Sequence, residues 1–193
     1  MDIEALSLPI QVGDKTTPNR LVNHPMECND ADGFGNPTEL TLRRYRQLAQ
    51  GGAGMIHVES LSVSHDSRGR KNQLEIGERN AEGLAKLVRS IREVNDRSLI
   101  IFQLNHSGNI SNADFSKVVS YCPTDDPSVQ MLSDEHVEGI KEMFVKAAGI
   151  SFQVGADGID FKQCHGYWCA QLLRPANVRQ GRFGGGFESR TRF

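Results

Sequence analysis

The feature that most constrains the fold of this chain is a repeated order of short apolar segments and amphipathic helical segments. Four apolar runs of strand length stand at residues 21–26, 55–59, 99–104 and 158–162. The first three are each followed by a segment with apolar residues three and four positions apart, which is typical of a helix with one buried face. Connections of this length suit parallel pairing of the strands, so the order predicts a βαβαβαβ chain.

The expected helices have recognisable start residues. Thr38, Asn80 and Ser133 each stand before a helical segment, and their side chains can accept hydrogen bonds from first-turn amides. Gly51 and Gly52 follow the first helix, where glycine readily ends it. The expected buried faces are Leu42, Tyr45, Leu48 and Ala49 in the first helix, Leu84, Leu87, Val88, Ile91 and Val94 in the second, and Val137, Ile140, Met143, Phe144, Ala147 and Ala148 in the third.

Two α/β architectures fit this order: an open doubly wound sheet and a (β/α)₈ barrel. The first strand-to-helix connection lacks the GxGxxG pattern of a dinucleotide-binding turn, which disfavours the open sheet. Polar residues follow all four strands, at Glu27, at 59–60, at 103–106 and at 162–167. A site built from several strand ends is the barrel pattern.

A complete (β/α)₈ barrel typically takes about 250 residues, whereas this chain has 193. We therefore expect residues 1–193 to form a single domain, the first half of such a barrel, which stops at the start of the fourth helix. A half-barrel exposes the edges of its sheet, and exposed edges invite pairing with another chain. The chain is accordingly expected to be cut rather than complete.

The composition excludes several classes of protein. Hydrophobic residues make up 38% of the chain and charged residues 24%, as in a globular protein. A net charge of −2 gives no electrostatic reason to expect nucleic acid or a membrane surface as a partner. Residues 1–6 are acidic and no apolar run reaches a membrane span of about 18 residues, so a cytoplasmic protein is expected. The four cysteines form no CxxC pair, which predicts reduced thiols and no metal site.

The fourth strand runs into the densest cluster of chemically active side chains. Lys162, His165 and Tyr167 stand within six residues, at a strand end where barrel enzymes place catalytic groups. Cys164 precedes His165, but adjacent residues on a strand point to opposite faces, which argues against a cysteine–histidine nucleophile. The cluster therefore predicts catalysis by Lys162, His165 and Tyr167.

Taken together, these motifs resemble the old yellow enzyme family of flavin-dependent ene reductases and their dienoyl-CoA reductase relatives. The resemblance extends over nearly the whole chain, because eight short motifs occur in the family's order. They are Asn19-Arg20-Leu21-Val22 with Pro25-Met26, Tyr45-Arg46 with Gly52-Ala53-Gly54, Val58-Glu59-Ser60, Gln103-Leu104-Asn105-His106-Ser107-Gly108, Gly155-Ala156-Asp157-Gly158-Ile159, His165-Gly166-Tyr167, Leu173-Arg174-Pro175 with Asn177 and Arg179, and Gly184-Gly185.

The resemblance implies FMN as cofactor and NAD(P)H as reductant. It implies that the backbone of Pro25, Met26 and Glu27 lies under the flavin and that Ser60 approaches its N5 and O4 edge. It also implies that Gln103 binds the pyrimidine end, a position that suits an amide because it both donates and accepts. The family's phosphate site follows its seventh and eighth strands, which have no counterpart in these 193 residues.

The resemblance also implies the reaction, which is hydride transfer from NAD(P)H through the flavin to the activated C=C bond of a small-molecule alkene. Lys162 and His165 would hold the substrate's carbonyl oxygen, where donors stabilise the charge that builds up. His165 can join Lys162 there on condition that the strand has already ended. Tyr167 would donate the proton, as a phenol in a dry pocket can.

Two residues depart from the family pattern. Glu27 stands where Thr or Cys is usual, and a lone carboxylate there would disfavour the anionic reduced flavin unless it turned away or were protonated. Lys162 stands where His or Asn is common, so a point charge replaces a planar donor. This charge could stabilise an enolate or bind an anionic group of the substrate. Both departures bear on the substrate class more than on the fold.

Two alternatives remain open at this stage. The chain could be a catalytically silent half-barrel, which is a truncation product, part of a split enzyme, or a module that pairs with a complementary half-barrel or with a second copy. It could also be a barrel lyase or aldolase in which Lys162 forms a Schiff base.

Overall fold

The computed structural model describes residues 3–193, and its centre is the parallel sheet that the sequence predicts. Met1 and Asp2, part of the acidic N-terminal stretch, lie outside the described residues. The four strands of the sheet are β3 (Val22–Asn23), β4 (Met55–Ser62), β5 (Leu99–Asn105) and β8 (Gly158–Phe161). They are hydrogen-bonded in the order β3-β4-β5-β8, and every pair is parallel.

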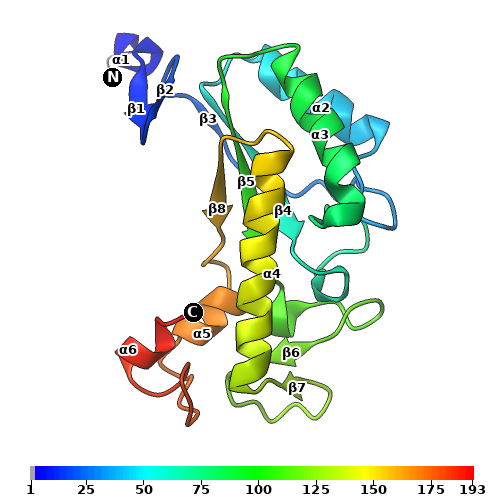
Figure 1. The fold of residues 1–193 in the computed structure, drawn as a ribbon, viewed down its shortest axis with the longest axis vertical. Coiled ribbons are helices and arrows are strands. Elements are labelled where there is room, and N and C mark those ends of the chain that lie inside the picture. The colour runs from blue at the N-terminus through cyan, green and yellow to red at the C-terminus, as the bar shows by residue number, and fades with distance from the viewer. Residues whose placement is uncertain (1–2) are drawn as a thin grey trace.

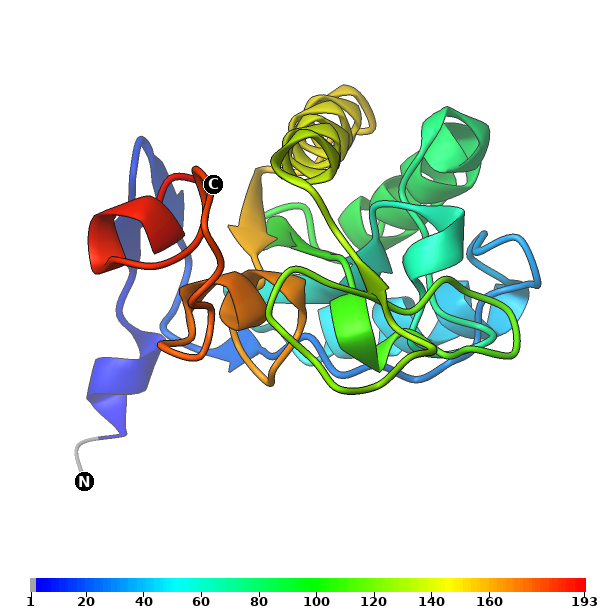
Figure 2. The same cartoon turned by 90° about the horizontal axis from the view of Figure 1, so that it is seen from below.

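Three long helices connect these strands and cover one side of the sheet. They are α2 (Glu39–Gln50), α3 (Ala81–Arg92) and α4 (Asp134–Gln153). Figure 2 shows α3 and α4 lying next to each other on that side. The sequence of strand and helix along the chain is thus βαβαβαβ, as predicted.

Shorter elements lie at the two ends of the sheet. They are the helices α1 (Glu4–Ser7), α5 (Trp168–Leu173) and α6 (Phe187–Arg190), the antiparallel pair β1 (Ile10–Val12) and β2 (Lys15–Thr17), the parallel pair β6 (Val119–Ser120) and β7 (Gln130–Met131), and three 3₁₀ turns at His65–Ser67, Glu78–Asn80 and Gly108–Ile110. In Figure 1 the β1–β2 hairpin lies at the end where the strands begin. The elements α5, α6, β6 and β7 lie at the opposite end, where the strands finish.

All three predicted helix starts are confirmed in position, and two of them are capped by the predicted side chain. The Thr38 and Ser133 side chains each accept a hydrogen bond from the backbone N–H three residues on, at Thr41 and His136. Asn80 stands at the N-cap position of α3 as predicted, but its side chain makes no capping bond. A 3₁₀ turn precedes α3, and the Asn80 amide instead donates to the loop before α2, where it fastens two connections together.

The predicted core is confirmed apart from Met143, which is 41% exposed. The buried faces of the three helices pack with the outward faces of β4 and β5 into one core cluster. On α4 the buried stripe continues instead to Ile150 and Ser151. Met143 stands one position before Phe144, at the margin of the buried stripe, and is therefore partly exposed.

The strands differ from their predicted lengths at both sides of the sheet. The first strand, at one edge of the sheet, has two residues rather than six. The second is longer than predicted, and its register with β5 shifts between Val58 and Leu61. A bulge of this kind redirects the side chains that follow it.

Both edges of the sheet are open, as expected for part of a barrel. Val22 on β3 and Ile159 on β8 are each 43% exposed, and Phe152 on α4 beside β8 is 82% exposed. In a complete barrel, further strands and helices would cover such positions. Across residues 3–193 the structure contains no helix long and apolar enough to cross a membrane.

Candidate functional site

The site is centred on Lys162, the first residue after β8. Its ammonium lies 3.3 Å from Glu27 Oε1 and 3.3 Å from Ser60 Oγ, and the side chain is 8% exposed. Glu27 follows the strand at one edge of the sheet and Lys162 follows the strand at the other. In a flat sheet three strand spacings would separate these edges by about 14 Å. The contact therefore runs across the concave side of a curved sheet, as inside a barrel.

Ser60 reaches Lys162 from the bulged part of β4. Glu59 and Ser60 both lie within the register shift, and both are almost fully buried. Ser60 Oγ accepts from Lys162, whereas the Glu59 side chain binds Arg44 on α2. These two consecutive side chains of β4 thus have different partners: Ser60 binds Lys162 in the concave site, and Glu59 binds Arg44 behind it.

Glu27 is bound by a second cation, Arg70, in the loop after β4. Arg70 Nε donates to Glu27 Oε2 at 3.1 Å, and this arginine side chain is 59% exposed. The two oxygens of Glu27 are therefore held by two different cations. From the sequence, Glu27 was expected to place a carboxylate beside the flavin. In the structure its charge is compensated by Lys162 and Arg70.

Tyr167 lies beside the Lys162 ammonium. The Lys162 nitrogen lies 4.1 Å from the centroid of the tyrosine ring, within the range of a cation–π contact. Burial raises the pKa of Tyr167, and the nearby Glu27 carboxylate raises it further. The phenol therefore keeps its proton at neutral pH, as a proton donor must.

His165 lies beyond the end of the strand, which was the condition for it to join Lys162. The strand β8 ends at Phe161, and the chain then turns. His165 has a φ of +58°, which is uncommon for a residue with a side chain. Its Nδ1 lies 2.9 Å from Cys164 Sγ, and both residues are exposed. The prediction that these two side chains point apart on a strand is wrong, because both residues lie in the turn after β8. Among the described residues, no hydrogen bond joins His165 to Lys162.

Gln103 lies on the concave face but outside the Lys162 cluster. Its Nε2 donates to Asp160 Oδ2 at 2.7 Å, and Asp160 is its direct neighbour on β8. His57 Nδ1 lies 3.7 Å from the same carboxylate oxygen, and burial lowers the pKa of His57. Asp160 thus orients the Gln103 amide. Asp160 was not predicted as a site residue, although it stands two positions before Lys162 and therefore on the same face of the strand.

A buried cluster behind the site holds the loop that carries Glu27. Arg44 of α2 binds Asp30 at 2.8 Å and also binds Glu59, whose Oε2 accepts the backbone N–H of Cys28 at 2.8 Å. Tyr45 Oη accepts the backbone N–H of Glu59. Burial raises the pKa of Glu59, and Arg44 opposes this rise. Arg44 and Asp30 were not predicted as supporting residues, because nothing in the sequence indicates that a charge on a helix and a charge in a loop will form an ion pair.

Pro25 and Met26 lie between β3 and Glu27. Pro25 is half-buried and Met26 is 72% exposed, so an apolar side chain stands beside the polar cluster. Together with the Gln103 amide, the Ser60 hydroxyl and the Lys162 ammonium, this set suits a flat ring that is apolar on its faces and polar along one edge. The residues present therefore fit the ring portion of FMN.

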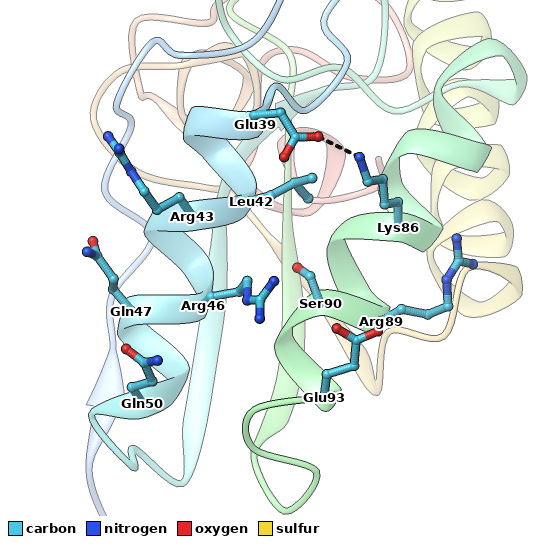
Figure 3. Close-up of a pocket in the computed structure, with 10 residues that line it drawn as sticks. All are labelled: Glu39, Leu42, Arg43, Arg46, Gln47, Gln50, Lys86, Arg89, Ser90 and Glu93. Carbon is cyan, nitrogen blue, oxygen red and sulfur yellow. Dashed lines mark hydrogen bonds and ion pairs between the residues drawn. The ribbon is translucent and has the colours of Figure 1, made fainter.

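A groove elsewhere on the molecule has no such chemistry. Figure 3 shows it between α2 and α3, with the exposed ion pair of Glu39 and Lys86 at one end. Its other lining side chains are charged or polar apart from Leu42, and they lie on the outer, helical side of the sheet. Likewise, no group of three or more potential metal ligands is present among residues 3–193.

Comparison with known proteins relates this geometry to one family. Residues 5–193 match the model of the NADH:flavin oxidoreductase / NADH oxidase family. The chain is 33% identical over 181 residues to an NADPH dehydrogenase of Clostridium acetobutylicum, covering 91% of this chain and 53% of that protein. It is 34% identical over 187 residues to an NADPH dehydrogenase of Bacillus pumilus, with 92% and 54% covered. The chain thus spans about half the length of these curated relatives.

Solved structures give the same picture of the fold. An old yellow enzyme from Pichia sp. AKU4542 superposes with a TM-score of 0.88 at 25% identity, over 97% of this chain and 53% of that one. A 2-naphthoyl-CoA reductase in complex with 2-naphthoyl-CoA superposes with a TM-score of 0.91 at 24% identity, over 98% and 32%. The described residues therefore have the fold of the first part of such a barrel.

Proposed function

This chain belongs to the NADH:flavin oxidoreductase / NADH oxidase family, and from that membership we propose that the whole protein reduces electron-poor C=C bonds. FMN is the cofactor that the family implies and NAD(P)H the reductant. The single observation that carries this proposal is the convergence of Glu27, Ser60, Lys162 and Tyr167 from three strand ends. The site residues retain the roles that the resemblance gave them, as proposals.

The cofactor would be held on the concave face of the sheet. The backbone of Pro25, Met26 and Glu27 would support the ring, and Ser60 and Gln103 would bind its polar edge. Gln103 Nε2 is bound by Asp160, which leaves the amide oxygen to accept from the cofactor. When bound, FMN supplies hydride transfer between NAD(P)H and the β-carbon of the alkene.

Lys162 would bind the substrate's activating oxygen, with His165 as the second donor. An ammonium has three N–H bonds, and Glu27 and Ser60 accept two of them. The third is free for a carbonyl oxygen, where a fixed positive charge stabilises the developing enolate. Tyr167, whose raised pKa keeps it protonated, would give its proton to the α-carbon and regain one from solvent.

The Schiff-base alternative has less support. An amine that attacks a carbonyl must have lost its charge, whereas Lys162 is the cation of an ion pair with Glu27. Borohydride trapping of a substrate on Lys162 would revive this alternative.

The test of the proposed function uses the full-length, FMN-loaded protein without oxygen. We expect one NAD(P)H to be oxidised for each enone reduced. If NAD(P)H were consumed with oxygen alone and the alkene stayed unchanged, the protein would be an oxidase instead.

The silent half-barrel is the second candidate, and the open edges at Val22 and Ile159 favour it for these residues taken alone. In this case residues 1–193 would be a single domain that associates with a complementary half-barrel or a second copy. The 193-residue chain, mixed with FMN and desalted, would then be colourless, whereas retained flavin absorbance would support a competent site.

A further inference from the structure

The Glu27 carboxylate lies between two cations, and this arrangement indicates the charge of the substrate. Lys162 binds one oxygen of Glu27 and Arg70 binds the other, at 3.3 and 3.1 Å. Two positive charges therefore meet one negative charge at the mouth of the site. The nearby cluster of one arginine and two carboxylates, Arg44, Asp30 and Glu59, lies behind the loop and makes its ion pairs internally.

Arg70 has binding capacity that its contact with Glu27 does not use. Only its Nε takes part in that contact, and among the described residues its two terminal nitrogens have no hydrogen-bond partner. The side chain is 59% exposed, so these nitrogens face solvent. A free guanidinium fork matches the two oxygens of a carboxylate.

Lys162 has one free N–H and lies on the other side of the same carboxylate. The Lys162 nitrogen and Arg70 Nε lie 3.3 and 3.1 Å from the two oxygens of the same carboxylate, so the two donor groups are within the length of a short substrate. A short substrate with a carbonyl at one end of its C=C bond and a carboxylate at the other could reach both.

We propose that the site selects activated alkenes that carry a carboxylate, and that Arg70 is the residue that determines this specificity. The proposal rests on the proposed function, since it concerns the substrate of that same site. Lys162 binds the activating carbonyl, and the Arg70 fork binds the carboxylate. Glu27 holds both cations in place and limits their attraction for anions.

The test compares 3-benzoylacrylate with its methyl ester as substrates of the full-length, FMN-loaded protein. The measured quantity is the ratio of kcat/KM for the acid to that for the ester, because intrinsic reactivity cancels when variants are compared. We expect Arg70→Gln to lower this ratio roughly three- to tenfold, as for a solvent-exposed charged hydrogen bond. Glu27→Gln should raise the ratio, because it removes the competing negative charge.

Two further variants separate a local effect from a change in net charge. Arg43→Gln changes the charge equally but lies in the outer groove of Figure 3, and it should leave the ratio unchanged. Arg70→Lys keeps the charge without the fork and should restore the ratio in part. An acid-to-ester ratio that changes less than about twofold in Arg70→Gln would overturn the proposal.

Equilibrium binding gives a readout that does not depend on turnover. Isothermal titration with the saturated analogues 3-benzoylpropionate and its methyl ester should show the same order of preference and the same opposite effects of the two variants. If no alkene were reduced but this preference held, the proposed function would fail and the specificity would stand. If alkenes were reduced and the analogues bound equally, the specificity would fail alone.

Discussion

Lys162 and Glu27 lie 135 positions apart in the chain, and their side chains form an ion pair across the concave side of the sheet. Each residue departs from the family pattern, and the structure shows that the two departures are one feature. A lysine this deeply buried needs a partner for its charge, and a carboxylate beside a flavin needs a cation. We therefore expect replacement of either Glu27 or Lys162 alone to be tolerated less well than replacement of both.

The ion pair predicts strong coupling between these two residues. Glu27→Gln alone leaves a buried ammonium with Ser60 and the Tyr167 ring, and Lys162→Gln alone leaves a carboxylate held by Arg70. Urea unfolding of the single and double variants should give a coupling free energy of about 1–3 kcal/mol. Additive effects within about 0.5 kcal/mol would show that the two residues are independent.

Tyr167→Phe separates the two half-reactions. We expect alkene reduction to fall by about a hundredfold or more, since general acid catalysis typically contributes 10²–10⁴. Reduction of the bound flavin by NAD(P)H should stay close to the wild-type rate, because no proton from Tyr167 is needed. Stopped-flow absorbance resolves both steps. Unchanged oxidation of the reduced protein by alkene would mean that another group is the proton donor.

The buried cluster behind the site predicts a large effect of Glu59. Glu59→Ala leaves the guanidinium of Arg44 short of one partner and the Cys28 N–H without its acceptor. The free energy of unfolding should fall by about 3–5 kcal/mol, as for a broken buried ion pair. The matched control is Glu39→Gln, whose pair with Lys86 is exposed, and its cost should stay below about 1 kcal/mol. Equal costs for both variants would rule out a supporting role for the cluster.

His106 predicts a loss of stability in acid. It is buried against Trp168, its Nδ1 accepts the N–H of Gly108, and burial lowers its pKa from 6.5 to about 4. The unfolded chain therefore binds this proton first. The stabilisation is fully present above the unfolded pKa and is lost as the pH falls towards 4, by up to about 3 kcal/mol.

His106→Asn should flatten that part of the pH profile, because its amide oxygen can accept from Gly108 without titrating. Urea unfolding at several pH values between neutral and about pH 4 measures this. Parallel profiles for the variant and the wild type would show that other groups cause the acid loss.

The cysteines should differ in reactivity. Cys28 and Cys164 are exposed, whereas Cys169 is buried and its burial raises the pKa to about 12. A maleimide at neutral pH should label the two exposed thiols first, since the thiolate and its access set the rate. Mass spectrometry of digested protein identifies the order. Early labelling of Cys169 would mean that α5 opens readily.

The sequence by itself determined the order of strands and helices, the parallel sheet, two of three helix caps and most of the core. Apolar periodicity, cap residues and polar residues after strands are patterns of neighbouring residues in the chain, and for this reason they predict strands, helices and the core. Periodicity failed where the chain departs from regular structure. Asn80 fastens two loops instead of capping α3, and Cys164 and His165 meet in a turn where a strand would have separated them.

The tertiary structure decided which charges meet. Curvature of the sheet brings the residue after one edge strand to the residue after the other, and the bulge in β4 places Ser60 between them. Arg44, Arg70 and Asp160 acquire their roles in the same way, through contacts between segments far apart in the chain. The physical reason is that an ion pair depends on distance in space, and a sequence pattern specifies only distance along the chain.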